Sequence, residues 1–207
     1  MIKLVASDLD GTLLQNGAQE LTPRALDLVR RLTEKGIVFV ASSGRQYDNE
    51  VNLFKPVKDQ ISYIAENGSI CIHKGNVISR TVIAPELIRR TIDEVKKDGP
   101  HIIDKYLHHL KAKFSSEIKV VTSGNIWIDF IAPGTNKGTA LLKLLDVLQI
   151  RPEECMAFGD QYNDVEMLQT VGTSYAMSNS APGISYYSTY VTDSVEDVLE
   201  DLLAAQE

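Results

Sequence analysis

The chain has 207 residues, of which 43% are hydrophobic and 24% charged, a balance typical of a globular protein with one substantial core and room for a small second lobe. Its formal net charge is -7 and its basic residues are not clustered, which argues against nucleic acid as a partner. No apolar run approaches the roughly 18 residues of a membrane span, so we expect no membrane partner. The amino terminus turns acidic at Asp8, where a signal peptide would still be apolar. We therefore expect a cytoplasmic protein.

The first part of the chain alternates strand-like apolar runs with stretches of helical period. The predicted strands and helices, in chain order, are residues 2–7, 21–35, 37–42, 46–54 and 61–66. Because strands joined by helices form right-handed crossovers, this order predicts a parallel sheet with helices on both faces. A turn at residues 74–76 then predicts a hairpin of residues 70–73 and 77–79.

The middle of the chain has a different pattern. Two helices are predicted over residues 85–97 and 103–114, followed by a hairpin of residues 118–122 and 126–132. The alternating order then returns, with predicted elements at residues 137–148, 155–158, 163–171, 174–177 and 195–205. We therefore expect a Rossmann-like α/β core, residues 1–84 and 133–207, interrupted by a small α+β cap, residues 85–132.

Two carboxylates lie at the end of the first predicted strand. Asp8 and Asp10 are one residue apart, and alternate side chains of an extended chain share a face at a spacing of about 6–7 Å. Two anions so placed favour a hard cation such as Mg²⁺, which takes oxygen ligands and usually accompanies a phosphate. A surface turn is the alternative, since Asp-Gly is also typical of turns.

Polar residues follow the later strands too, at the edge where open parallel sheets bind ligands. Ser43, Gly44 and Arg45 come after the second strand, where a hydroxyl and the Gly44 N–H can approach an anion. Lys137 lies near a helix start, where a cation gains nothing from the helix dipole but could bind a phosphate. Taken singly, Ser43 could instead cap a helix and Lys137 could be solvated.

Another acidic run follows a late strand. Residues 159–164 read Gly-Asp-Gln-Tyr-Asn-Asp, so Asp160 and Asp164 add two carboxylates at the same expected edge. Either aspartate could instead cap or charge the start of the next helix. The convergence of four acids, one lysine and one hydroxyl at strand ends favours a functional site over separate coincidences.

This set of motifs resembles the haloacid dehalogenase superfamily, and within it the Cof-type phosphatases, which carry an α/β cap between the second and third motifs. The matching stretches are Asp-Leu-Asp-Gly-Thr at 8–12, Ser-Gly-Arg at 43–45, Lys137, and the run at 159–164. Glu-Asn-Gly at 66–68 also matches a stretch common in Cof-type members. The resemblance covers both parts of the expected core.

The resemblance implies a role for each matched residue in phosphate chemistry. Asp8 would attack phosphorus and form an aspartyl-phosphate, while Asp10 would protonate the leaving oxygen and then activate water. Ser43, the Gly44 N–H and Lys137 would hold the transferred phosphoryl group.

Magnesium is the cofactor that the resemblance implies. Asp8, Asp160 and the carbonyl of Asp10 would bind Mg²⁺ directly. Asp164 and Asn163 would bind it directly or through water, or would orient its ligands, and Asn163 is also a candidate phosphate contact.

The implied activity is hydrolysis of small phosphorylated metabolites, such as sugar phosphates or phosphoglycolate. One alternative is phosphoryl transfer to a sugar instead of water, as in similar phosphomutases. Another is a switch without catalysis, in which phosphorylation of the aspartate changes a binding surface. Asp10 argues against the switch, because a switch gains nothing from rapid hydrolysis.

The expected cap is shorter than is usual for Cof-type relatives. We therefore expect a less enclosed site, with specificity resting on few residues or on a partner chain. Trp127, Asp129 and Arg45 are candidates for such specificity, although Trp127 could instead pack inside the cap. The apolar surface that a reduced cap leaves could be covered in a homodimer.

Overall fold

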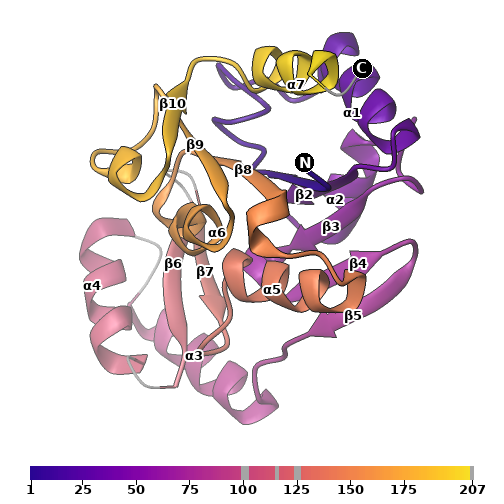
Figure 1. Ribbon diagram of the computed structural model, residues 1–207. Coiled ribbons are helices and arrows are strands. Elements are labelled where there is room, and N and C mark those ends of the chain that lie inside the picture. Colours follow the sequence, from indigo (N-terminus) through magenta and orange to yellow (C-terminus); the bar gives the residue numbers. More distant parts are fainter. Residues whose placement is uncertain (99–102, 115–116, 124–126, 206–207) are drawn as a thin grey trace. The chain divides into compact units, whose positions relative to one another are not determined.

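An eight-stranded sheet organises most of the chain (Figure 1). The computed structural model describes residues 1–98, 103–114, 117–123 and 127–205. Contacts divide the chain into two compact units, which we call the core unit (residues 1–80 and 136–207) and the inserted unit (residues 81–135).

The core unit contains the whole large sheet, in the order β10-β9-β8-β1-β2-β3-β4-β5. Its strands are β1 (Leu4–Ser7), β2 (Val38–Ser42), β3 (Ser62–Ala65), β4 (Ile70–His73), β5 (Asn76–Arg80), β8 (Cys155–Gly159), β9 (Thr173–Met177) and β10 (Tyr190–Thr192). Strands β10 to β3 run parallel, and β4 and β5 are added antiparallel at one edge. The predicted parallel sheet is confirmed, but strand β10 was not predicted.

Helices cover both faces of this sheet, as predicted. Their bounds are α1 (Pro23–Glu34), α2 (Tyr47–Leu53), α5 (Lys137–Leu148), α6 (Val165–Thr170) and α7 (Val195–Ala204), with short 3-10 turns at Glu66–Gly68, Pro152–Glu154, Tyr162–Asp164 and Ile184–Tyr187. Side chains of β1 alternate between two buried clusters, because Val5 packs with α1 and α7 while Leu4 packs with α5 and α6. Within the described residues, none of the helices is both long and apolar enough to cross a membrane.

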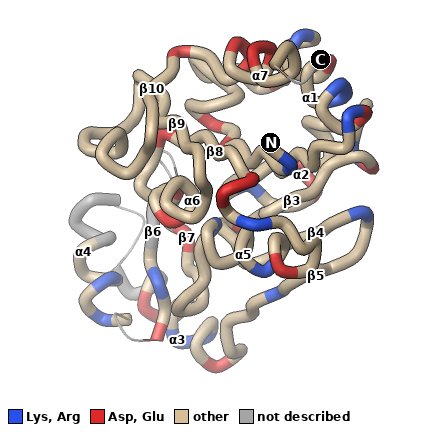
Figure 2. Tube along the Cα trace, in the orientation of Figure 1, with Lys and Arg blue, Asp and Glu red and all other residues tan. Residues whose placement is uncertain are grey.

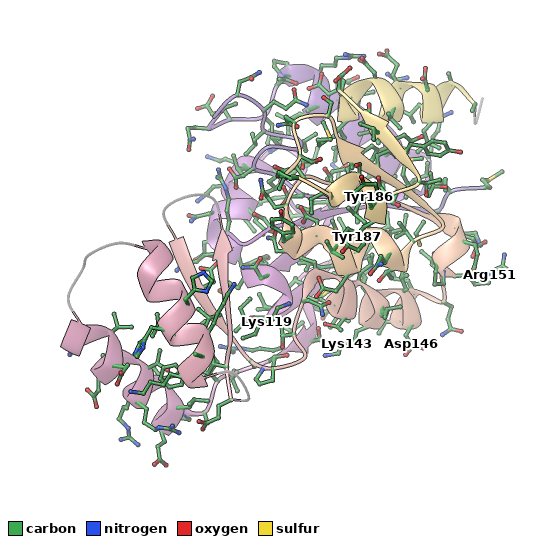
Figure 3. All side chains as sticks on the ribbon, turned by 90° about the vertical axis from the view of Figure 1, so that its left-hand side faces the viewer. Lys119, Lys143, Asp146, Arg151, Tyr186 and Tyr187 are labelled. Atoms are coloured by element: carbon green, nitrogen blue, oxygen red, sulfur yellow. The ribbon has the colours of Figure 1, made fainter. Side chains whose placement is uncertain are left out.

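Ion pairs between partly exposed side chains connect α1 and α7. Arg24 of α1 forms ion pairs with Glu196 and Asp197 of α7, with N–O distances of 3.6 and 2.7 Å, and with Glu200 as well. Figure 2 shows the resulting neighbouring basic and acidic stretches. Lys143 of α5 is likewise exposed (Figure 3), whereas Lys137, the first residue of the same helix, is buried.

The inserted unit has its own elements and its own small core. It consists of α3 (Pro85–Asp98), α4 (Ile103–Phe114), β6 (Lys119–Ser123) and β7 (Trp127–Ile131), with the two strands paired antiparallel. This is the predicted helix-helix-strand-strand order. Leu110, Phe114, Ile118 and Val120 form its buried cluster, while apolar residues of α3 such as Ile88 and Ile92 are 42% and 45% exposed.

Candidate active site

The carboxyl ends of β1 and β8 bring the first and last predicted motifs together. The two strands are paired in parallel with Ser7 opposite Phe158, and the backbone N–H of Asp8 donates to the carbonyl of Phe158 at 3.0 Å. Asp8 and Asp160 therefore leave adjacent strands at the same edge, as the sequence predicts.

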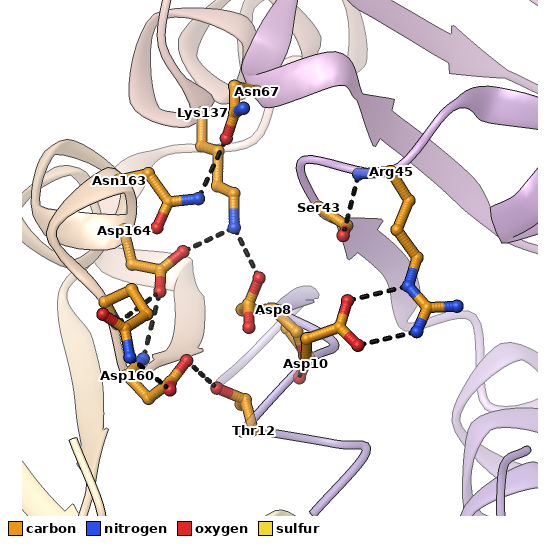
Figure 4. Close-up of polar contacts among 12 residues, drawn as sticks. Asp8, Asp10, Thr12, Ser43, Arg45, Asn67, Lys137, Asp160, Asn163 and Asp164 are labelled. Atoms are coloured by element: carbon orange, nitrogen blue, oxygen red, sulfur yellow. Dashed lines mark hydrogen bonds and ion pairs between the residues drawn. The ribbon is translucent and has the colours of Figure 1, made fainter. Parts of the chain in front are cut away.

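Lys137 lies between two of the predicted acids (Figure 4). Its Nζ donates to Oδ1 of Asp8 at 2.5 Å and to Oδ1 of Asp164 at 2.6 Å, and its side chain is fully buried. Burial alone would lower the pKa of Lys137, but the charges of Asp164 and Asp8 outweigh burial and raise it. The ammonium is therefore protonated at neutral pH.

Three buried aspartates form an acidic cluster around this lysine. Asp8, Asp160 and Asp164 each offer a carboxylate oxygen, and these oxygens lie within 4.8 Å of one another. Burial is the main cause of a raised pKa at both Asp8 and Asp160, and the charge of Asp164 raises both further. Lys137 contacts two of the three carboxylates and carries a single positive charge, so a divalent cation with oxygen ligands fits this cluster.

Backbone and hydroxyl groups fix the geometry of the cluster. Oδ2 of Asp164 accepts from the backbone N–H groups of Asp160 and Gln161, both at 3.0 Å. Thr12 Oγ1 donates to Oδ1 of Asp160 at 3.1 Å. Gly11 has φ +90°, and a Cβ there would lie 2.3 Å from Oδ2 of Asp160, so only glycine fits beside this carboxylate.

Asp10 faces a different partner from Asp8. Its two carboxylate oxygens accept from Nε and Nη2 of Arg45 at 2.7 and 2.6 Å, a bidentate pair. The Asp10 carboxylate is thus not part of the acidic cluster, and the metal contact predicted for its backbone carbonyl stays a prediction. Arg45, predicted as a specificity residue, contacts the predicted acid–base residue, and its role in specificity stays a prediction.

The remaining motif residues line the same edge. Ser43 is buried, and its Oγ accepts from the backbone N–H of Arg45 at 3.2 Å, which leaves its own proton to donate. The neighbouring Gly44 is half-buried. Asn163 Nδ2 donates to Oδ1 of Asn67 at 2.9 Å, so its amide is held by a residue to which the sequence assigned no role.

The turn at Glu66–Gly68 supports the start of α5. Asn67 has φ 54°, and Gly68 packs so closely on residue 136 that a Cβ would lie 2.2 Å from the Asn136 carbonyl oxygen. Asn136 in turn caps α5, because its side chain accepts from the Thr139 N–H. The turn therefore helps to place Lys137. The Glu-Asn-Gly stretch at 66–68, noted in the sequence as a family match, is the part of the sequence that indicated this turn.

The two predicted specificity residues of the cap belong to β7 in the inserted unit. Asp129 is half-buried and lies opposite Val121 of β6. The side chain of Trp127 is outside the residues that the structure describes. Their role in specificity stays a prediction.

Glu50 of α2 is a buried acid that sequence reasoning missed. It is fully buried, and neither carboxylate oxygen has a hydrogen-bond partner among the described residues. Burial raises the pKa of Glu50 well above its ordinary value, Asp8 and Glu66 add to this, and Lys137 and Arg45 oppose it. A glutamate on a short helix resembles a solvated residue in sequence, so no signal pointed to it.

The raised pKa of Glu50 makes the stability of the fold dependent on pH. Below the ordinary carboxyl pKa, the folded and unfolded chains both carry the proton. Above it, the unfolded chain releases the proton while the folded chain keeps it, so stability falls by about 1.4 kcal/mol per pH unit until the folded pKa is reached.

Glu50→Gln titrates in neither state and removes this loss. Its advantage over the wild type should therefore grow as the pH rises above the ordinary carboxyl pKa, by up to about 1.4 kcal/mol per pH unit. Urea unfolding at several pH values measures the difference, with exposed Asp48→Asn on the same helix as the matched control. A difference that does not change with pH would contradict the assignment.

Comparison with known proteins decides the family. A family model described as haloacid dehalogenase-like hydrolase matches residues 5–104 and 97–200. The chain belongs to the haloacid dehalogenase-like hydrolases. The predicted resemblance is confirmed, and the named phosphatases among the relatives of this hydrolase support a phosphatase enzyme.

Two relatives and one solved structure illustrate the similarity. The hydrolase is 26% identical to the 5-amino-6-(5-phospho-D-ribitylamino)uracil phosphatase YbjI of Escherichia coli, over 98% of this chain and 96% of the relative. It is 26% identical to a phosphoglycolate phosphatase of Methanoculleus marisnigri, over 87% of this chain and 86% of the relative. The solved structure of a haloacid dehalogenase-like hydrolase of Bacteroides thetaiotaomicron shares the fold with a TM-score of 0.85. The sequence identity is 20%, and the match covers 98% of this chain and 100% of that one.

Proposed function

We propose that this hydrolase is a Mg²⁺-dependent phosphatase that cleaves small phosphorylated metabolites through an aspartyl-phosphate at Asp8. The observation that carries the proposal is the buried Lys137 ammonium, which holds Asp8 on one side and Asp164 on the other. A buried cation beside a carboxylate at an open strand end suits the transfer of a phosphoryl group.

Asp8 is assigned to attack phosphorus. Lys137 donates to its Oδ1 at 2.5 Å, and the other carboxylate oxygen, Oδ2, is assigned to form the bond to phosphorus. Ser43 Oγ and the Gly44 N–H are assigned to the equatorial phosphoryl oxygens, together with Lys137. These groups offset the charge that spreads over the phosphoryl group in the transition state.

Asp10 is assigned to the two proton transfers. It gives a proton to the leaving alcohol oxygen in the first step and takes one from the attacking water in the second. Its bidentate pair with Arg45 fixes the direction of the carboxylate. One residue can serve both steps because the leaving alcohol and the water approach phosphorus from the same side.

Mg²⁺ would be held by Asp8, Asp160 and the carbonyl oxygen of Asp10. When bound, it would neutralise phosphate charge and favour the ionised form of Asp8. We assign Asp164 to orientation, since its oxygens already accept from Lys137 and from the N–H groups of residues 160 and 161. The Asn163–Asn67 pair is assigned to the same supporting role.

We propose that residues 85–132 act as a reduced cap. The alignment with YbjI runs over 261 positions, more than the 207 residues of this chain, so the relative carries additional residues. The two family matches overlap at residues 97–104, within the inserted unit, which supports a shortened segment there. Trp127 and Asp129 are the cap residues assigned to specificity.

The relatives support a small phosphorylated metabolite as substrate without selecting one. Their printed names include a phosphatase for a ribitylamino-uracil phosphate, one for phosphoglycolate and one for HMP-PP. A screen of phosphorylated metabolites, with and without Mg²⁺, tests the proposal. We expect phosphate release that depends on Mg²⁺; a folded protein that releases none, even from p-nitrophenyl phosphate, would contradict it.

A further inference from the structure

The segment that follows β9, residues 178–181, lies at the same edge of the sheet as the acidic cluster. Strands β8 and β9 are paired in parallel with Gly159 opposite Ala176, so both strands end at this edge. The segment turns directly after the strand, because the N–H of Ser180 donates to the carbonyl oxygen of Met177 at 3.0 Å. None of the motifs identified in the sequence includes these residues.

This segment contacts two loops of the site at once. Asn179 Nδ2 donates to the carbonyl oxygen of Gly11, in the loop after β1, at 3.0 Å. Two residues later, the N–H of Ala181 donates to the carbonyl oxygen of Asp160, in the loop after β8, at 2.8 Å. One short segment therefore connects the loop of the first motif with the loop that carries Asp160.

The residue that Asn179 contacts lies against the carboxylate of Asp160. Gly11 approaches this carboxylate so closely that a Cβ on it would lie 2.3 Å from Oδ2 of Asp160. Thr12, the next residue, donates to Oδ1 of the same carboxylate at 3.1 Å. The position of Gly11 and Thr12 thus decides where the Asp160 carboxylate lies.

The peptide group between Gly11 and Thr12 is held at both of its polar ends. Its carbonyl accepts from Asn179, and its N–H donates to the carbonyl oxygen of Leu9 at 3.2 Å. Because the peptide group is planar, these two bonds fix its orientation. Gly11 has φ +90° and no side chain to restrict its backbone, so the orientation depends on such bonds.

The bond from Asn179 contributes to position more than to stability. Asn179 is exposed, so its amide exchanges one hydrogen bond for another with water and adds little to the free energy of unfolding. Asp160, whose carboxylate depends on the loop that Asn179 holds, is buried. Loss of the Asn179 amide should therefore affect the site while the fold stays intact.

We infer that Asn179 is a positioning residue for the metal site, which holds the loop against the Asp160 carboxylate and thereby increases the affinity for Mg²⁺. This inference rests on the proposed function, in which Asp160 is a ligand of Mg²⁺. Partners that orient a metal ligand commonly contribute about 10–100-fold to metal affinity. Asn179 acts through Gly11, one contact farther from the ligand, so its contribution should be about three- to tenfold.

Two variants, Asn179→Ala and Asn179→Leu, test the inference, since both remove the donor and leucine keeps much of the side-chain volume. The thermal unfolding midpoint, measured over a series of Mg²⁺ concentrations, gives the dissociation constant of Mg²⁺ without substrate. Both variants should unfold close to the wild-type midpoint without Mg²⁺, and their dissociation constants should be about three- to tenfold higher.

Ser178→Ala is the matched control. Ser178 is an exposed residue of the same segment, and its side chain makes no hydrogen bond with any residue that the structure describes. This variant should keep the wild-type dissociation constant of Mg²⁺. Phosphate release from p-nitrophenyl phosphate, measured at the same Mg²⁺ concentrations, should recover in the Asn179 variants as the metal approaches saturation.

The outcomes separate this inference from the proposed function. Asn179 variants that bind Mg²⁺ as tightly as the wild type, whether or not they are less stable without it, would overturn the inference and leave the phosphatase assignment intact. A wild type that releases phosphate while its midpoint does not respond to Mg²⁺ would overturn the inference together with the role of magnesium. Weaker Mg²⁺ binding in both variants, with a folded wild type that releases no phosphate, would support the inference and contradict the phosphatase.

Discussion

Replacing Asp8 with asparagine is expected to abolish phosphate release and to leave the fold intact. The amide keeps the shape of the side chain, and its oxygen can still accept from Lys137, which contacts Asp8 at 2.5 Å. An amide cannot form the aspartyl-phosphate, so the two-step route is lost altogether. We expect kcat to fall at least about 1,000-fold.

Measurement of phosphate release under saturating substrate and Mg²⁺ tests this expectation, and thermal unfolding shows whether the variant is folded. Intact-mass analysis of rapidly quenched wild type adds a second readout, because the aspartyl-phosphate adds the mass of one phosphoryl group. Asp8→Asn should show no such species. A folded variant that keeps more than about one hundredth of the wild-type rate would remove Asp8 from the role of nucleophile.

The meeting of Asp8, Asp160, Asp164 and Lys137 could be predicted from sequence because it depends on topology. Parallel strands end at one edge of a sheet, so residues that directly follow β1 and β8 must lie close together. The apolar runs that form those strands are clear in the sequence, and the order of strands and helices leaves few arrangements. Asp164, which directly precedes α6, lies only five residues after β8, whereas Lys137 begins α5 after the inserted unit and was matched through the family motif.

The contacts that could not be predicted depend on side-chain directions and on local packing. Asp8 and Asp10 share a strand end, yet one contacts Lys137 and the other Arg45, a choice set by where α5 and the loop after β2 place their cations. Asn67 contacts Asn163 across 96 positions of sequence, which no local pattern records. The short edge strand β10 has only three residues, too few for a period-2 pattern to stand out.

The second large effect is expected from Lys137→Met, which removes the cation and keeps much of the side-chain volume. Lys137 is fully buried, and its ammonium is the partner of two buried carboxylates, Asp8 and Asp164. Loss of one partner leaves uncompensated buried charge, so the free energy of unfolding at neutral pH should fall by about 3–5 kcal/mol. Phosphate release should fall at least about 100-fold, because a charge on the phosphoryl group is no longer offset.

Lys143→Met on the same helix is the matched control, since Lys143 is exposed and should change neither quantity measurably. Urea unfolding at neutral pH and near pH 5 separates the loss of charge pairing from a packing defect. Without the opposing charge of Lys137, the raised pKa of Asp8 rises further, so protonation of Asp8 at lower pH relieves part of the penalty. If Lys137→Met loses the same free energy of unfolding at both pH values, the loss is due to packing. If Lys137→Met is as stable and as active as Lys143→Met, the buried ammonium does not hold the site together.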